Sequence, residues 1–527
     1  MRLRRLVARL PIVLAFVVVL NEGRAATRGL EWPWDYDQFR NIAQAQTAAD
    51  GGWLADPFYA GESVFYNPLL AWVTGMLVGP SGPPIHAFQT QLGSALDLLG
   101  PIALLVLLRR WLGRAPAEMA LLYLLFFNLG PAGSEPFWSN PTYSPWMVAQ
   151  NLAEPFFFAS LVALGAAVSR PRAWRYAATG VLVGLTFLAH TGPLPLFLVL
   201  LVAELVRSRR SRSLRPRDVL LIGAVAALVA APFLASILGR YGAHVQNAAP
   251  ILWRWLPELR QAGPVLAAQL PWTSAFALMG LALCWRKRRR PGVARLLVLS
   301  GSALVFFLLG FAHDIPWLRR VSWIQLVPQH HFWFYLRVFE AALVGLAWAA
   351  LLGLGFHRLK PYGVTSGRRA ALRGALVAVA VLVALPGYRQ RTGLVAGRQA
   401  IARQHHDLRG VERRRLWEWL RHGTQPREVF LASDLDALLV VAPAGRRVLA
   451  LDEAFSSPYV DLRPRVDARN RLLRLLAARR WPRLLALAHE WNVRHVLLPA
   501  GEALPADAPL ALEFSTALYR VYGVPSG

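Results

Sequence analysis

The sequence contains a single cysteine, Cys284, among its 527 residues. One thiol permits no intrachain disulfide, and the paired Cys and His spacings of zinc sites are missing too. The chain also lacks a Gly-rich phosphate loop, a Walker element, a Gly-x-Ser-x-Gly motif, internal repeats and low-complexity tracts beyond its basic loops. These absences argue against an enzyme that uses a nucleotide sugar directly.

Acidic residues are scarce as well: 30 Asp and Glu stand against 58 Lys and Arg, which gives a net charge of +28. Such a surplus can indicate a nucleic-acid partner. The Arg clusters, however, fall between long apolar runs, where membrane topology needs them, so we expect membrane lipids and no nucleic acid as partners. Hydrophobic residues make up 55% of the chain, and the mean hydropathy is +0.36. The sequence therefore predicts a polytopic α-helical membrane protein.

Eleven apolar runs are each long enough to cross a bilayer, which takes about 20 residues. They cover residues 6–21, 91–109, 115–131, 147–169, 174–190, 192–206, 218–239, 270–285, 294–311, 332–356 and 369–387. The first is interpreted as an uncleaved helix, because no small-x-small cleavage site closes its apolar run. A further run, residues 64–80, carries two prolines and two glycines, which suits a helix lying at the membrane interface.

The distribution of arginine predicts the topology. Counting 64–80 as a span would place Arg109, Arg110 and Arg114 outside, whereas leaving it out places every strong Arg cluster inside. We therefore expect 11 transmembrane helices in the cytoplasmic (inner) membrane, with the N-terminus inside and the C-terminal domain outside. Polar and aromatic residues then gather on the outer face, above all in the long loop 22–90, and we expect the function there.

Composition divides the chain into three parts. Residues 1–388 form the predicted transmembrane catalytic domain, residues 389–426 an amphipathic connector, and residues 427–527 a small soluble α/β domain. In the last part, strands are expected at 428–432, 447–451, 493–499 and 512–522, with one amphipathic helix over 469–489.

Two carboxylates, Asp35 and Asp37, follow the first span. The residues after Asp37 have helical composition, so Asp37 can be interpreted as a helix cap, which leaves Asp35 unexplained. The functional interpretation is a general base assisted by a second carboxylate, which orients the acceptor or binds a divalent cation such as Mg²⁺ or Mn²⁺. We favour Asp35 as the base, with Glu62 in the same loop as the reserve candidate.

The segment Phe65-Tyr66-Asn67-Pro68-Leu69 lies further along the same loop. Together with Asp35 and Asp37 it resembles the GT-C glycosyltransferases, including mannosyl- and arabinosyltransferases, in which an acidic motif follows the first span and an aromatic-x-Pro-Leu element opens the second jaw helix. The resemblance covers roughly residues 1–360. It implies a hexosyl- or pentosyltransferase that moves a sugar from a polyprenyl-phosphate carrier to a glycan, lipid or protein acceptor, with Tyr66 and Asn67 near the substrate.

Several basic residues are candidates for the carrier phosphate. His190, at the junction of two spans, is either structural or a donor to a phosphate or sugar. Arg337 would lie inside a late span, where a charge needs a partner. That partner is either Glu340, three residues on, or the phosphate that the GT-C resemblance implies. The remaining candidates are Arg319, Arg320, His330 and His331.

Three carboxyl groups, those of Asp97, Glu154 and Glu340, fall inside predicted spans. They should line a polar cavity or pair with arginine, and the alternative is hydrogen bonding between helices by protonated carboxyls. A lipid-linked glycan transporter or flippase, or a non-catalytic scaffold for envelope assembly, remains the rival to the enzyme. Sugar release from a lipid-linked donor separates the enzyme from both.

Overall fold

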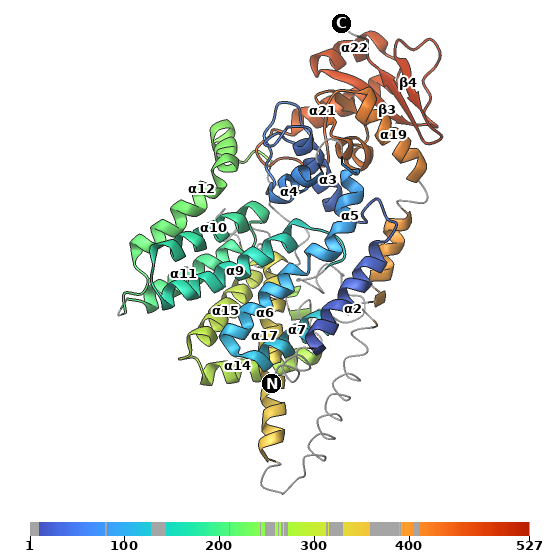
Figure 1. The fold of residues 1–527 in the computed structure, drawn as a ribbon. Helices are drawn as coiled ribbons and strands as arrows, with labels where there is room; N and C mark the ends of the chain where they lie inside the picture. The colour runs from blue at the N-terminus through green and yellow to red at the C-terminus, as the bar shows by residue number, and fades with distance from the viewer. Residues whose placement is uncertain are drawn as a thin grey trace.

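The computed structural model describes residues 10–525, except residues 79–81, 128–143, 210, 243, 248–258, 262, 265–266, 268–271, 312–314, 316–329, 359–388, 390–391, 394 and 405–409. The described chain is helical up to residue 423 and mixes strands with helices beyond it (Figure 1).

Ten of the eleven predicted spans coincide with helices, one of them, 91–109, with parts of two helices. The run 369–387 lies outside the described residues. The helices are α2 (Leu10–Thr27), α5 (Ile85–Leu96), α6 (Leu99–Leu112), α7 (Arg114–Phe126), α9 (Ala149–Ser169), α10 (Ala173–Ala189), α11 (Leu194–Arg207), α12 (Pro216–Tyr241), α14 (Ala275–Arg286), α15 (Pro291–Phe311) and α17 (His330–Arg358). In the described part, five stretches are long and apolar enough to cross a membrane: Ile85–Leu112, Ala149–Ser169, Pro216–Tyr241, Pro291–Phe311 and His331–Gly353. The prediction of a polytopic helical membrane protein is confirmed.

These helices pack around one apolar core while keeping large apolar side chains on their outer faces. The core includes Leu121 of α7, Phe157 of α9 and Val338 of α17. The outward side chains include Leu228 and Leu278, each more than 70% exposed. Because a water-soluble protein would not expose such faces on helix after helix, they suit contact with lipid.

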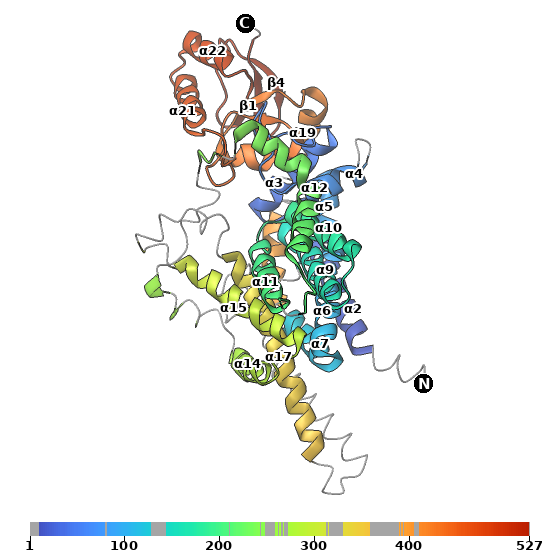
Figure 2. The ribbon, with the colours of Figure 1, turned by 90° about the vertical axis from the view of Figure 1, so that its left-hand side faces the viewer.

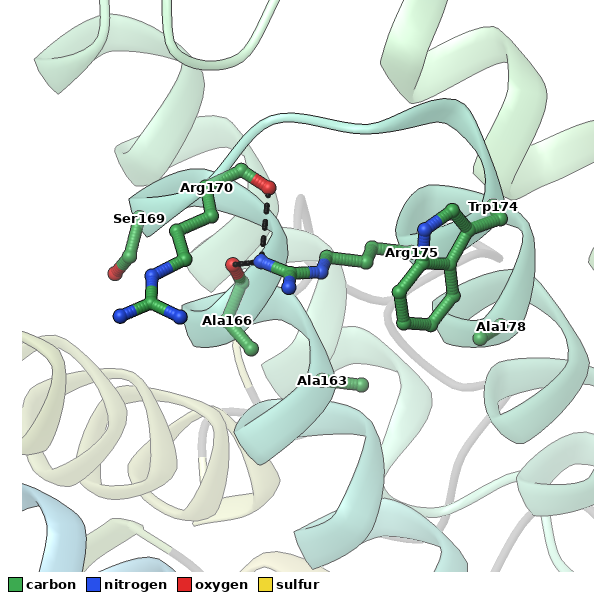
Figure 3. A pocket seen from close by; sticks show the side chains of 7 residues that line it. All are labelled: Ala163, Ala166, Ser169, Arg170, Trp174, Arg175 and Ala178. Carbon is green, nitrogen blue, oxygen red and sulfur yellow. Dashed lines mark hydrogen bonds between the residues drawn. The ribbon is translucent and has the colours of Figure 1, made fainter.

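The turn between α9 and α10 closes one end of the bundle (Figure 3). Arg175 reaches back and donates to the carbonyl oxygens of Ala166 and Arg170, at 3.3 and 3.0 Å, so that it caps the end of α9. Trp174 borders a hollow of about 320 Å³ beside them. This turn carries one of the Arg clusters predicted to face the cytoplasm.

The first loop forms two helices at the opposite end, α3 (Tyr36–Ala49) and α4 (Leu69–Val78). With 10 residues, α4 is about 15 Å long, too short to cross a bilayer. It lies against α3, where a Cβ on Gly75 would come within 3.1 Å of the Ala49 nitrogen. The expectation of a non-spanning helix within 64–80 therefore agrees with the structure.

The C-terminal part is a five-stranded mixed sheet with the order β2-β1-β3-β5-β4. The strands are β1 (Val429–Leu431), β2 (Arg447–Val448), β3 (Val493–Pro499), β4 (Ala511–Ser515) and β5 (Tyr519–Gly523). β1 pairs in parallel with β2 and β3, whereas β5 pairs antiparallel with β3 and β4. The prediction of a small α/β domain is confirmed.

Two predicted elements of this domain were wrong in detail. The expected strand 512–522 is a hairpin, because the Thr516 hydroxyl accepts from the backbone N–H groups of Leu518 and Tyr519 and turns the chain. The expected helix 469–489 is two helices, α21 (Arg463–Ala477) and α22 (Trp481–Glu490). Arg479 has φ of 52° between them, a left-handed conformation that ends a helix.

The sheet domain lies against the first loop, at the end of the molecule that carries α3 and α4 (Figures 1 and 2). Trp32, Phe39 and Tyr59 of the loop share one apolar core with Phe430 of the sheet and with Leu416 of α19 (Gly410–Gly423). The Val448 N–H also donates to the Phe58 carbonyl at 2.8 Å. The loop is thereby held between the sheet domain and the membrane helices.

Candidate functional site

The carboxyl group of Asp35 caps α3. Asp35 has extended backbone angles, and its Oδ1 accepts from the Asp37 N–H at 3.1 Å. The interpretation of Asp37 as the cap was therefore wrong, because the helix begins one residue earlier, at Tyr36. Asp35 therefore has a structural role of its own, and the two carboxylates differ as candidate bases in their surroundings.

Asp37 lies in the first turn of α3 and pairs with Arg40, three residues on. The distance from Arg40 Nη1 to Asp37 Oδ1 is 3.1 Å, and the two side chains are 9% and 41% exposed. The Arg40 guanidinium lies 3.7 Å from the centre of the Tyr66 ring, a cation–π contact. Arg40 thus joins the acidic motif to the second jaw element.

The segment around Tyr66 is anchored from two sides. Gln44 of α3 donates to the Tyr66 carbonyl at 3.0 Å. Asn67 donates to the Phe187 carbonyl at 2.6 Å and accepts from the Thr191 hydroxyl at 3.2 Å. The predicted substrate residue Asn67 therefore ties the first loop to the junction between α10 and α11.

His190 lies at that same junction, where it follows the last residue of α10. Its Nδ1 accepts from the Gly192 N–H at 3.0 Å, so a neutral ring carries its proton on Nε2. The ring packs edge-on against Tyr66, with centroids 6.4 Å apart. It also lies 4.6 Å from the ring of His331, in the first turn of α17.

Four separate chain segments therefore meet in one site, which we call the carboxylate–histidine cluster: Asp35, Asp37, Arg40, Tyr66, His190 and His331. Burial and the neighbouring charge of Asp37 raise the pKa of Asp35 from 3.8 to about 6, although the positive charges of Arg398 and Arg40 oppose this. A carboxylate with this pKa can accept a proton from a hydroxyl group near neutral pH. The cluster combines such a base with groups suited to an anion.

Glu62 makes its contacts in a different place. It accepts from Arg240 Nε at 3.0 Å and from the Tyr241 hydroxyl at 2.8 Å, and Arg465 approaches to 3.5 Å. These groups line a shallow cleft of about 520 Å³ between α12 and the sheet domain. In the described part of the chain, the reserve candidate for the base is held by arginines rather than by the carboxylate–histidine cluster.

Arg337 is fully buried and forms an ion pair with Glu340. It also donates to the Ser274 hydroxyl at 3.3 Å and lies over the Trp333 ring at 5.7 Å. Of the two partners expected for Arg337, the structure thus shows Glu340. Arg319, Arg320 and the side chain of His330 lie outside the described residues.

Sequence reasoning missed Arg40 and Arg398. An arginine inside a polar helix is ordinarily expected to face solvent. The available signal was that Arg40 follows Asp37 by three residues, the spacing that places two side chains on one helix face. Arg398, whose guanidinium lies 4.5 Å from the centre of the Trp34 ring, is some 360 residues from Asp35 in sequence. No local pattern brings those two together.

The two carboxylates of the acidic motif do not provide enough ligands for a metal ion. Among the described residues no group of three or more His, Cys, Asp or Glu side chains could hold an ion. Asp35 and Asp37 offer two carboxylates, of which one caps a helix and the other pairs with Arg40. As they stand, the two side chains do not form a metal site on their own.

Comparisons with solved structures find the same fold over nearly the whole chain. ArnT from Cupriavidus metallidurans, solved with bound undecaprenyl phosphate, superposes with a TM-score of 0.56 at 16% identity and covers 98% of this chain and 99% of its own. The oligosaccharyltransferase AglB from Archaeoglobus fulgidus, in complex with an inhibitory peptide and a dolichol-phosphate, gives 0.54 at 12% identity over 92% of this chain and 69% of its own.

An oligosaccharyltransferase from Archaeoglobus fulgidus tethered to an acceptor peptide gives a TM-score of 0.52 at 13% identity, and a structure in complex with zinc and sulfate also matches. No protein-family model and no curated protein matches the chain. The likeness is thus one of architecture, with little sequence identity left. This chain shares the overall fold of ArnT and of the archaeal oligosaccharyltransferase, as the GT-C resemblance of its acidic motif and jaw element predicts.

Proposed function

We propose that the protein is a glycosyltransferase that moves a sugar from a polyprenyl-phosphate carrier to an acceptor hydroxyl. The observation that carries the proposal is the carboxylate–histidine cluster, which lies where the membrane helices meet the first loop. The carriers seen with ArnT and AglB support a lipid-linked donor. The acceptor is a glycan, lipid or protein, and the sugar is a hexose or pentose.

The chemistry follows from the positions of the side chains. Asp35 or Asp37 accepts the proton of the acceptor hydroxyl, and the acceptor oxygen attacks the anomeric carbon. The bond from that carbon to the phosphate oxygen breaks, and the carrier phosphate leaves with the electron pair. One base and one leaving phosphate suffice, so we expect inversion at the anomeric carbon.

Arg40, His190 and His331 are the groups of the cluster that suit the departing phosphate. Arg40 brings a buried positive charge, and His190 brings an Nε2–H donor. Arg337, six residues after His331 on α17, remains a candidate for the same task. A divalent cation at Asp35 and Asp37 would need further ligands and would compete with Arg40 for Asp37.

We place the cluster on the outer face of the inner membrane, together with the sheet domain. This orientation rests on the Arg clusters, since turns such as that between α9 and α10 lie away from the end that carries α3 and α4 (Figure 1). A carrier lipid embedded in the bilayer can then present its phosphate to the cluster, while a soluble or lipid-bound acceptor approaches from outside.

The test uses purified full-length protein in detergent and a synthetic undecaprenyl-phosphate-linked sugar. We expect the protein to release free carrier phosphate when a suitable acceptor or water is present, and mass spectrometry measures this release. A transporter or a scaffold leaves the donor intact. Donor that stays unhydrolysed and untransferred with every acceptor class, although it binds, would favour the transporter.

A further inference from the structure

Three membrane helices bring buried oxygen atoms together away from the carboxylate–histidine cluster. Asp97 follows the last residue of α5, Glu154 lies on α9, and Tyr335 lies on α17. Their exposed fractions are 1%, 0% and 0%. Each of the three helices belongs to a stretch apolar enough to cross a membrane, so these are polar groups inside the predicted bilayer region.

Most of these oxygens lack a hydrogen-bond partner. Asn151 donates to Asp97 Oδ2 at 3.2 Å. Asp97 Oδ1, both carboxyl oxygens of Glu154 and the Tyr335 hydroxyl are buried and have no hydrogen-bond partner in the described part of the chain. Four such atoms in one region are costly, because each polar group loses its hydrogen bonds to water without gaining a partner in the apolar interior.

The charges of the two carboxyls are also uncompensated. Both Asp97 and Tyr335 contact α9 within one turn of Glu154: Asn151 donates to Asp97 at 3.2 Å, and the rings of Phe157 and Tyr335 have centroids 5.4 Å apart. Among the described residues, neither Asp97 nor Glu154 forms an ion pair, whereas Glu204, another buried carboxyl of the bundle, pairs with Arg295 at 3.1 Å. Like charges buried together need a positive ion or protons between them.

The backbone adds acceptors at the same place. Pro155 has no N–H, so the carbonyl of Asn151 loses its helical partner one turn earlier. Asp97 lies where α5 ends and α6 has yet to begin, at the negative end of the α5 dipole. Interrupted helices with freed carbonyls and nearby carboxylates are a recurring way to hold cations inside membrane proteins.

We propose that Asp97, Glu154 and Tyr335 form a binding site for a hard divalent cation with oxygen ligands, such as Ca²⁺, Mg²⁺ or Mn²⁺. Two carboxylates balance a charge of +2. A carboxyl pair that shares a proton would be joined by a hydrogen bond, and the carboxyl oxygens of Asp97 and Glu154 make none to one another. Hard cations take oxygen ligands in this way. The ion would fasten α9 and α17 to the break between α5 and α6.

The experiment measures cation-dependent stability of the full-length protein in detergent. Chelator-treated protein is melted with and without millimolar CaCl₂, MgCl₂ or MnCl₂, and its bound metal is counted by elemental analysis. We expect one of these salts to raise Tm by several degrees and to load about one ion per chain. Glu154→Gln and Asp97→Asn should abolish both effects, and Tyr335→Phe should weaken the apparent affinity several-fold while keeping the fold.

Two controls locate the ion. Glu204→Gln changes a buried carboxyl that has arginine partners, so it should lower Tm yet leave the cation response intact. The double variant Asp35→Asn/Asp37→Asn should also keep the response, which separates this ion from one at the candidate active site. No cation response in the wild type, or a full cation response in Glu154→Gln, would each overturn the proposal.

Discussion

Asp35 combines a structural and a proposed chemical role, and the two can be separated. Asparagine caps helices about as well as aspartate, so Asp35→Asn should keep α3 in place and leave Tm close to that of the wild type. The proposed base must be ionised, so activity should rise with pH through about 6, the pKa that burial and Asp37 give this carboxyl.

The neighbouring charge predicts how that pH profile moves. Because the charge of Asp37 helps to raise the pKa of Asp35, Asp37→Asn should shift the acidic limb of kcat/KM to lower pH. Measuring kcat/KM for carrier-phosphate release from pH 4.5 to 8 checks this. A limb that stays in place or moves to higher pH in Asp37→Asn would show that Asp35 is not the titrating base.

Arg337 can be tested against its partner Glu340. Removing one member of a buried ion pair leaves the other uncompensated and costs about 3–5 kcal/mol, so Arg337→Gln should lower Tm strongly. The double variant Arg337→Gln/Glu340→Gln should recover much of that stability. If Arg337 also holds the donor phosphate, activity stays low in the double variant, and restored activity would assign the residue to structure alone.

The residues of the cluster could be predicted to different degrees. The acidic motif, Tyr66, His190 and His331 stand out in the sequence because polar groups at the ends of apolar runs are unusual. Their meeting depends on how α3, α4, α10, α11 and α17 pack, which no local pattern contains. Arg40 was missed because its burial depends on packing against the distant Tyr66 ring, which the sequence around Arg40 does not predict.

At the scale of elements, the apolar runs predicted the helices well because a bilayer imposes both length and composition. The predictions were wrong where a local hydrogen bond or a single backbone conformation ends an element, as at Thr516 and Arg479. The predicted span 91–109 runs across the break between α5 and α6, although the sequence carries a signal for it. Pro101 has no N–H for the Asp97 carbonyl four residues earlier, and Gly100 precedes it.

Close helix contacts give a prediction for α17. A Cβ on Gly345 would come within 2.4 Å of the Ala120 nitrogen on α7, whereas a Cβ on Gly353 of the same helix meets nothing within 4 Å. Gly345→Ala should therefore force α7 and α17 apart and lower Tm by several degrees. Gly353→Ala serves as the control and should hold or raise Tm, because alanine favours helix by up to about 1 kcal/mol. Equal Tm values for the two variants would contradict this packing.

At the scale of the whole molecule, the shared core of the first loop and the sheet domain fixes both on one side of the membrane. Single cysteines at Ala400 and Glu502, both exposed, and at Gly51 in the first loop, placed in a variant with Cys284 replaced, report the side. All three should react with an impermeant maleimide in intact cells. Reaction of the Ala400 or Glu502 cysteine only after permeabilisation would reverse the proposed orientation.

The most direct test of the proposed transfer is a comparison of wild type, Asp35→Asn and Asp37→Asn on an undecaprenyl-phosphate-linked sugar. The quantity measured is the rate of carrier-phosphate release at pH 7.5, with Tm recorded for each protein. Loss of a general base typically costs 10²- to 10⁴-fold, so at least one variant should lose about that much activity with Tm near wild type. Full turnover by both variants would contradict a transferase whose base is in the acidic motif.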